Sequence, residues 1–365
     1  MMTPAMLRER IKGGEALSDL NLRGIALDGL DLAGAVMHRC DLTGASLAGA
    51  DLRDSCFSEC RMERTDWRGA DVSECAYFRC DLAQADFREA ACADTAFVEC
   101  RAPRIDFRGN TLKSCHFTHT ALSGARLEDV TLHEGSYAEC ALDEASFAKA
   151  RMAKVTFVRA DLRHTDLAGA ALDKTVFIES DLSGLALAGQ ALDGCQFIDA
   201  RMDGCDLRRA KLAQANFKGA SLRRARLNGA HADRALFVQA DLSQADAAGA
   251  SFEQSAWPDA CLDGAVLSGA NLTQAVLHRA RCAATRFDGA RLVYTDFSYA
   301  DLRDADLRHA QLQRTQLHRA LTDGARWSSR DGILENDPAL YEAELWSARR
   351  GARVAAREGG PTPAR

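Results

Sequence analysis

Residues 300–320 read ADLRDADLRHAQLQRTQLHRA. Leucine recurs at every fifth position, at Leu302, Leu307, Leu312 and Leu317, and a small residue stands two places before each leucine. An α-helix turns about 100° per residue, so five residues leave successive leucines about 140° out of line. A straight β-strand has a period of two, so an odd spacing sends alternate leucines to opposite faces. The spacing therefore predicts a chain that turns a corner once in every five-residue unit.

The same register extends over most of the 365 residues. From Leu22 to Leu317, sixty consecutive positions five residues apart hold an apolar residue, with no insertion or deletion. We call this residue the centre of its unit. The run is interrupted only by small residues, at Cys92, Ala102, Ala232, Ala247 and Cys282.

Glycine and proline support a corner in each unit. Most of the 27 glycines lie two places after a centre, as Gly24 and Gly219 do. If the centre opens a four-residue turn, this glycine occupies the third place, where a type II turn requires a positive φ. The two prolines inside the array, Pro103 and Pro258, directly follow a centre, where the turn requires a φ near −65°.

Aromatic centres indicate four units per coil. From Phe57 to Trp257, every centre twenty residues apart is aromatic, whereas the column ten residues away is mostly leucine. The sequence thus predicts an all-β, four-sided parallel β-helix of about 15 coils, roughly 70 Å long at the ~4.8 Å spacing of stacked strands. A leucine-rich horseshoe also has a period near 20, but the sequence lacks its L-x-L pair and asparagine ladder. A left-handed hexapeptide β-helix requires a period of six.

Several units resemble the consensus A-[D/N]-L-x-x of the pentapeptide repeat family, namely ADLRD, ADLRH, ANLTQ and ADLSQ. The resemblance covers about residues 17–327 and implies a right-handed quadrilateral β-helix with short helical caps. Because the ends of such an array expose strand edges, we expect covers there. We expect residues 1–16 to form an N-terminal cap with a short helix. For residues 328–365 we expect a linker, a helix at about 337–350 and a disordered tail.

The expected C-terminal helix is amphipathic. Asp337 and Pro338 resemble an N-cap followed by proline at the first helical position. Tyr341 and Leu345 share one face, and Trp346 lies beside it. Two interpretations stay open: the helix covers the last coil, or it contacts a second copy in a homodimer, as the resemblance implies for proteins that pair through this end.

A ladder of charges is the strongest candidate for a protein-docking site. The units TDWRG, ADFRE and IDFRG follow one another at intervals of twenty residues. They stack three aspartates in one row and three arginines in another: Asp66, Asp86 and Asp106 with Arg68, Arg88 and Arg108. Opposite charges in adjacent rows offset the repulsion within each row. The ladder is either a solvated salt-bridge surface or a docking patch.

Other reactive residues favour structural roles. Cysteine occupies one inward column, at Cys40, Cys60, Cys80, Cys100 and Cys140. Small buried thiols explain this column better than disulfides or a metal, since parallel side chains in a packed core bridge poorly. All nine histidines fall on outward positions, and His116 and His119 flank Phe117. Arg208, Arg209, Arg223, Arg224 and Arg226 form a small basic area that could contact an anion.

Composition and motifs restrict the class of function. The chain has 52 acidic and 46 basic residues, a net charge of −6, and no basic excess of the kind that nucleic-acid binding requires. No apolar stretch approaches the ~18 residues of a membrane span. The 13 cysteines follow the repeat, which is typical of a reducing cytoplasm. No P-loop, dinucleotide, nucleophile-elbow or zincin motif is present, so we expect no enzyme activity and no cofactor.

The leading interpretation is therefore a non-catalytic protein-binding scaffold in the cytoplasm, and the family resemblance implies that this cytoplasm is bacterial. The family resemblance implies more specific roles, of which the first is an accessory or adaptor protein for a bacterial secretion effector, of the type VI system in particular. An alternative is a DNA mimic that binds gyrase or topoisomerase IV. A passive structural spacer, or a secreted effector, is a third alternative.

Overall fold

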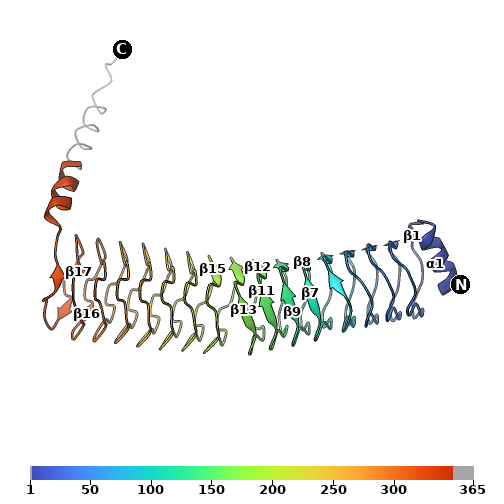
Figure 1. The fold of residues 1–365 in the computed structure, drawn as a ribbon, viewed down its shortest axis with the longest axis horizontal. Helices are drawn as coiled ribbons and strands as arrows, with labels where there is room; N and C mark the ends of the chain where they lie inside the picture. Colours follow the sequence, from blue (N-terminus) through green and yellow to red (C-terminus); the bar gives the residue numbers. More distant parts are fainter. Residues whose placement is uncertain (1, 348–365) are drawn as a thin grey trace, which may run out of the picture.

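The computed structural model describes residues 2–347 and shows a long rod of about 16 stacked coils with one short helix near each end (Figure 1). The prediction of a quadrilateral parallel β-helix is confirmed. The array is longer than the predicted 15 coils because pairing continues beyond Trp327 as far as Leu334. No helix in this part of the chain is long and apolar enough to cross a bilayer.

Each strand pairs in parallel with the strand twenty residues later. In the largest sheet, Phe57 is the partner of Tyr77, and Phe97 that of Phe117. This ten-stranded sheet runs in the order β1 (Leu17–Ser18), β2 (Val36–His38), β3 (Cys56–Ser58), β4 (Ala76–Phe78), β6 (Ala96–Val98), β8 (His116–Thr118), β10 (Ser136–Ala138), β12 (Thr156–Val158), β14 (Val176–Ile178) and β15 (Gln196–Ile198).

A second side of the rod carries a five-stranded sheet. Its order is β13 (Ala171–Asp173), β11 (Arg151–Ala153), β9 (Thr131–His133), β7 (Thr111–Lys113) and β5 (Cys92–Ala93). Two short pairs close the last coil: β16 (Asp306–Leu307) with β18 (Arg326–Trp327), and β17 (Thr315–Gln316) with β19 (Ile333–Leu334). Between these regions the coils are joined by single bridges in the same twenty-residue register, for example Asn216 to Leu236.

Stacked aromatic rings fill the core beneath the ten-stranded sheet. The rings of Phe97 and Phe117 are parallel, with centroids 4.7 Å apart, and those of Phe117 and Tyr137 are 4.9 Å apart. These distances equal the spacing of the strands that carry the rings. A second stack, Trp67 on Phe87 at 5.2 Å, meets the first edge-on. The twenty-residue register predicted from the aromatic centres is therefore confirmed.

Positive φ angles recur at the corners. Gly24 and Gly219 have φ of +60° and +67°, as a type II turn requires. The same position has a positive φ even where no glycine is present, for example +57° at Arg104 and +52° at Ala284. The corner conformation is thus a property of the coil, and glycine only relieves its strain.

The cysteine column is buried, as predicted, and hydrogen-bonds to the backbone. Cys80 and Cys140 are 1% and 2% exposed. The thiol of Cys80 donates to the carbonyl of Phe57 in the preceding coil at 3.4 Å. Thr120 occupies the same column and donates to the carbonyl of Phe97 at 3.0 Å. Burial raises the pKa of Cys140 to about 11, so this thiol stays protonated.

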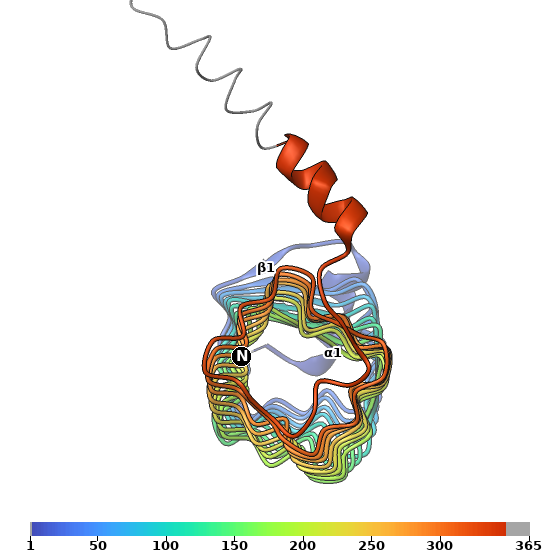
Figure 2. The ribbon, with the colours of Figure 1, turned by 90° about the vertical axis from the view of Figure 1, so that its left-hand side faces the viewer.

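The N-terminal helix α1 (Pro4–Lys12) lies across the opening of the first coil (Figure 2). Its N-cap is Thr3, whose side chain accepts a hydrogen bond from the amide of Met6, and it ends at Gly13. Leu7 and Ile11 are buried against the first coil. This is the cover that an exposed sheet end needs.

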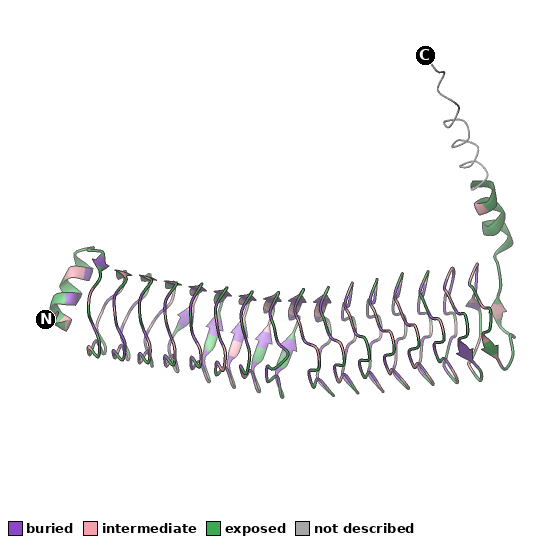
Figure 3. Cartoon of the chain, turned by 180° about the vertical axis from the view of Figure 1, so that it is seen from behind, coloured by how far each residue is buried: buried purple, intermediate pink, exposed green. Residues whose placement is uncertain are grey.

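The C-terminal helix is placed differently. Residues 338–347 are helical, and Asp337 accepts a hydrogen bond from the amide of Leu340, so the predicted N-cap is present. The helix projects from the rod (Figures 1 and 2) and is mostly exposed (Figure 3). The structure corrects the expectation that this helix covers the last coil, where Leu312 and Trp327 remain partly exposed. Its predicted end near residue 350 and the predicted tail lie outside the described residues.

Candidate protein-docking surfaces

The Asp-x-Arg unit forms a rigid pair because of its spacing. The residues before and after a buried centre both point outward, so their side chains lie next to each other. In the unit around Phe87, Arg88 donates from Nε to Oδ1 of Asp86 at 2.9 Å and from Nη2 to Oδ2 at 2.6 Å. The amide of Arg88 also donates to Asp86 Oδ1 at 3.1 Å. A bidentate pair of this kind holds the guanidinium in one orientation.

Consecutive coils join these pairs into the predicted ladder. Arg68 Nε lies 3.9 Å from Asp86 Oδ2, and Arg88 Nε lies 3.8 Å from Asp106 Oδ2. Arg126 closes the row with Nη1 3.3 Å from Asp106 Oδ2. All six predicted residues are therefore brought together, including Arg108, which binds its own Asp106 at 2.8 Å.

Electrostatics keeps the ladder ionised. Hydrogen bonds from Arg68 lower the pKa of Asp66 below its ordinary value. Burial raises the pKa of Asp106, but hydrogen bonds from Arg108 outweigh that effect and leave the pKa lowered. Asp66 and Asp106 thus stay negative at neutral pH, next to arginines that are always charged.

The ladder borders a shallow depression of about 600 Å³. Asp86, Arg88, Asp106 and Arg108 line one side of it. The other side comes from the adjoining corner and consists of Gln84, Arg104, Gly124 and Glu144. Arg126 completes the lining. Asp66 and Arg68 extend the ladder beyond the depression.

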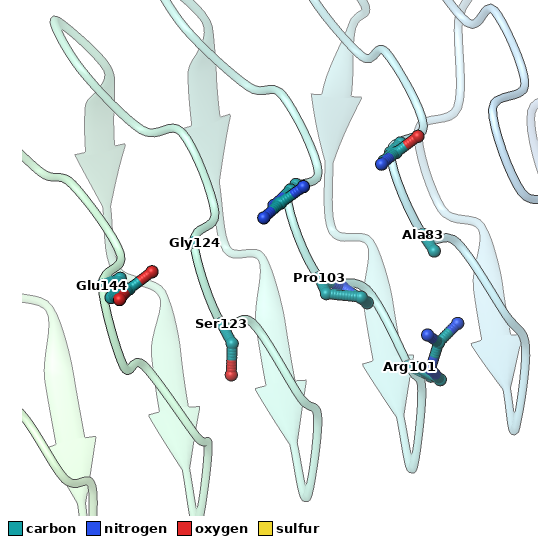
Figure 4. A pocket seen from close by; sticks show the side chains of 8 residues that line it. Ala83, Arg101, Pro103, Ser123, Gly124 and Glu144 are labelled. Carbon is teal, nitrogen blue, oxygen red and sulfur yellow. The ribbon is translucent and has the colours of Figure 1, made fainter.

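The corner residues also line a second depression of about 360 Å³ on the next side of the rod (Figure 4). Gly124 lines both depressions and keeps the space between them open. A Cβ at this position would approach Cγ of Arg104 to 3.3 Å. Sequence reasoning missed Gln84, Arg104 and Glu144. The only signal for them was their shared place two residues after a centre, which predicts a row along one corner.

The helix residues proposed as a cap or dimer contact lie on the projecting helix. Tyr341 lies beneath Arg319, whose guanidinium is 4.8 Å from the ring centroid. Leu345 and Trp346 are 36% and 62% exposed. Glu344 holds the helix to the rod through Tyr299, His318 and Arg319.

His318 corrects the prediction that all nine histidines face outward. Its position is outward in the repeat, but the C-terminal segment covers it completely. Its Nδ1 accepts a hydrogen bond from the amide of Asp337 at 3.2 Å, and its Nε2 lies 3.3 Å from Glu344. This burial depends on a segment that the repeat pattern does not describe.

The remaining candidates have structural partners. His116 lies 2.8 Å from the hydroxyl of Ser136, and His119 lies 3.3 Å from Glu139. In the predicted basic area, Arg208 and Arg226 both bind Asp206, and Arg223 binds Asp203. Across residues 2–347, no group of three or more His, Cys, Asp or Glu side chains is arranged to hold a metal ion.

The geometry defines a class of protein: a β-solenoid built of five-residue units whose sides carry regular rows of side chains. Comparison with known families agrees. A model described as pentapeptide repeats matches residues 21–58, 90–129, 192–229, 220–255, 260–283 and 285–321, and a model of a pentapeptide repeat region matches residues 110–187. These matches cover more than half of the chain, which belongs to the pentapeptide repeat family.

Several solved structures are similar to this chain. QnrB1, a plasmid-mediated fluoroquinolone resistance protein, is 20% identical over 56% of this chain and 97% of that one, with a TM-score of 0.27. HetL from Nostoc sp. strain PCC 7120, involved in heterocyst differentiation regulation, is 21% identical over 91% and 99%, with a TM-score of 0.16. A pentapeptide repeat protein of the Arabidopsis thaliana thylakoid lumen is 30% identical over 34% and 69%, with a TM-score of 0.21. A comparison with curated proteins finds no match.

Proposed function

We propose that this chain is a non-catalytic scaffold that binds another protein through the charged ladder and its depression. The observation that carries the proposal is the coincidence of three consecutive bidentate pairs with a hollow beside them. Arginine is enriched among the residues that contribute most to protein interfaces. Here the side chains of Arg68, Arg88 and Arg108 are 52%, 41% and 34% exposed.

Preorganisation is the physical advantage of such a ladder. A free arginine loses rotamer freedom when it binds, at a cost of about 0.5–1.5 kcal/mol. In the ladder, each guanidinium is already held by its own aspartate and by the next coil. Four arginines line the depression against three acidic residues, so the lining favours a partner segment that presents an acidic side chain.

Partner capture from the source organism tests the proposal. We expect the wild-type chain to retain a stable partner and Arg88→Glu/Arg108→Glu to lose it, because two cations of the lining become anions. Arg303→Glu is the matched control, since Arg303 forms the same bidentate pair with Asp301 outside the depression. Capture of no partner, or equal capture by all three proteins, contradicts the proposal.

The identity of the partner is a separate proposal. An effector of a type VI secretion system is supported only by the resemblance to long, loop-free family members. Identification of the captured protein tests it. For the alternative of DNA mimicry, a supercoiling assay with purified gyrase is the test. The ion pairs weaken this alternative, because aspartates such as Asp86 and Asp206 are neutralised by adjacent arginines. The spacer alternative predicts that nothing is captured.

We also propose the projecting helix as a contact with a second copy. The exposure of Leu345 and Trp346 supports it, since apolar side chains on an exposed helix gain free energy when another surface covers them. Leu345→Glu should then lower the mass measured by analytical ultracentrifugation. An unchanged mass would assign the helix to another role.

A further inference from the structure

The outward side of the ten-stranded sheet differs from the other sides of the rod. We call the outward side of β4 to β14, with its two bordering corners, the sheet face. The residue after each centre forms a row along it: Phe78, Val98, Thr118, Ala138, Val158 and Ile178. The residue before each centre forms a second row: Ala76, Ala96, His116, Ser136, Thr156 and Val176. Neither row contains a carboxylate, lysine or arginine, and no described helix lies over them (Figure 1).

Both corners that border these rows are charged, and each follows its own pattern. On one corner cationic and anionic residues alternate on either side of His119: Arg79, Glu99, His119, Glu139, Arg159 and Glu179. On the other corner acidic residues precede basic ones: Glu74, Asp94, Ser114, Glu134, Lys154 and Lys174. Neighbouring coils pair these charges within the chain. Arg79 lies 2.6 Å from Glu99, Arg159 lies 2.8 Å from Glu139, and Lys154 lies 2.9 Å from Glu134.

We propose that the sheet face binds the sheet face of a second copy, with the two rods antiparallel. The two-fold axis lies in the interface, perpendicular to the rods, between the coils of Phe117 and Tyr137. This symmetry places each corner against the same corner of the other copy in reverse order. Two sheets meeting in this way pack about 10 Å apart, which lets the outward rows touch.

This register makes the charged corners complementary. On the alternating corner, Arg79 faces Glu179, Glu99 faces Arg159, and His119 faces Glu139 of the other copy. On the other corner, Glu74 faces Lys174, Asp94 faces Lys154, and Ser114 faces Glu134. Every pair of full charges on these six coils is therefore of opposite sign.

The apolar rows match in the same register. Phe78 faces Ile178, Val98 faces Val158, and Thr118 faces Ala138. Their contact buries apolar area along the middle of the interface, and the charges at its rim select the register.

Neighbouring registers are less favourable. A shift by one coil places Glu99 against Glu139 and Arg79 against Arg159. In the proposed register, like charges first meet in the coils just beyond these six, where Glu59 faces Asp199. The charge pattern of the two corners therefore specifies both the antiparallel direction of the rods and the position of the two-fold axis.

The dimer is compatible with the proposed scaffold. The docking ladder belongs to units centred on Trp67, Phe87 and Phe107, two units away from the aromatic centres of the sheet face. In a four-sided coil, two units away is the opposite side. The dimer therefore leaves one ladder open on each outer side, and loss of either interface can be measured without loss of the other.

A charge swap between Glu99 and Arg159 tests the proposal. All variants are made in a parent chain that carries Leu345→Glu, which removes the helix contact. Sedimentation of this parent chain should give about twice the monomer mass of 39.6 kDa. Glu99→Arg and Arg159→Glu should each weaken the dimer by about tenfold or more, because each places like charges across the interface. The double variant should dimerise again, since the two exchanged charges face each other across the interface with opposite sign. An equimolar mixture of the two single variants should form a heterodimer for the same reason.

The double variant separates this effect from loss of ion pairs within the chain. Within one chain, Glu99→Arg leaves Arg79 next to a second cation, and Arg159→Glu leaves Glu139 next to a second anion. A defect inside the monomer would therefore persist in the double variant. The matched control is Arg279→Glu, which breaks the same kind of pair, with Asp259 at 2.7 Å, at the same corner but outside the sheet face. Its mass should be that of the parent chain.

Molecular shape distinguishes this dimer from one made through the C-terminal helix. With coils stacked at about 4.8 Å, the antiparallel pair is roughly one third longer than a single rod, whereas an end-to-end pair is about twice as long. Small-angle scattering measures this difference. Three results would each overturn the proposal: a parent chain that stays monomeric up to about 100 µM, a double variant that dimerises as weakly as the single ones, or a parent dimer twice as long as one rod.

Discussion

Residues 17–198 and residues 199–305 share one register and one core, but only the first region forms β-strands at its aromatic centres. In the first region, β-strands join the coils into sheets of ten and five strands. In the second, the coils are joined by single bridges. The aromatic stack continues through both, with Phe217 and Phe237 4.9 Å apart. The difference therefore lies in the backbone at the corners and on the outer surface.

Hydrogen bonds at the aromatic centres of this one side of the rod show how the two regions differ. In the second region, the amide of Ala220 closes its turn by donating to the carbonyl of Phe217 at 3.0 Å. In the first, the carbonyl of Phe97 accepts from the hydroxyl of Thr120, which belongs to the next coil. The flanking residues agree: Val98, Val158 and similar β-branched residues favour extended backbone. On this side, the strand region has extended backbone between its corners, whereas in the turn region each aromatic centre opens a hydrogen-bonded turn.

The largest expected effect comes from removing a ring of the shared stack. Phe117→Ala should lower the free energy of unfolding by about 3–5 kcal/mol, because it leaves a cavity between Phe97 and Tyr137. Phe237→Ala in the turn region should have an effect of similar size. Coils contact only their neighbours, so each substitution should destabilise its own region first. Hydrogen exchange read by mass spectrometry checks this. Simultaneous loss of protection along the whole rod would show that the two regions unfold as one unit.

A smaller effect should follow from removing the side-chain hydrogen bond of the strand region. Thr120→Val keeps the shape but removes a hydroxyl that donates to the carbonyl of Phe97 and accepts from the buried amide of Cys100, and we expect a loss of about 1–3 kcal/mol. Thr120→Ser retains a hydroxyl and should recover most of it. Chemical denaturation measures the three proteins. Equal stability of the valine and serine variants would mean that the hydroxyl does not hold these coils together.

The sequence was sufficient to predict the core and its register, but not the difference between the two regions. Inward residues such as Phe97 and Phe117 repeat in every coil, so each unit carries the same signal. Whether a corner forms a strand depends on neighbouring coils that pair with it, which is a property of several units at once. The burial of His318 was also not predictable, because it depends on Glu344, 26 residues away and outside the repeat. The ladder of Asp86 and Arg88 was predictable since both members belong to the repeat, whereas the adjoining depression arises where two sides meet.

A still smaller effect tests what the two regions have in common. Ala284 in the turn region and Ser114 in the strand region have φ of +52° and +50°. Such a φ costs a residue with a Cβ about 1–2 kcal/mol, and glycine avoids this cost while losing about 0.5–1 kcal/mol in chain entropy. Ala284→Gly and Ser114→Gly should therefore each raise the denaturation midpoint slightly and by similar amounts. The reverse change, Gly249→Ala at φ +66° with open space around its Cβ, should lower it. A gain confined to one region would indicate that the strain differs between the two kinds of corner.

The smallest expected effect concerns the Asp-x-Arg pairs, which occur in both regions. Hydrogen bonds from Arg208 lower the pKa of Asp206 to about 2. Because the folded pKa lies below the ordinary value of 3.8, the pair stabilises the fold above about pH 4 and loses this contribution as the pH falls through about 2. Arg208 is half-exposed to solvent, so screening by water keeps this contribution small. The urea denaturation midpoint of the wild type should decrease between pH 5 and pH 2. In Asp206→Asn this decrease should be smaller. Asp106→Asn in the strand region should do the same, since burial raises the pKa of Asp106 but Arg108 and Arg126 outweigh it and leave that pKa lowered. An unchanged pH dependence in both variants would mean that the pairs order the surface without stabilising the fold, which the docking role of the ladder permits.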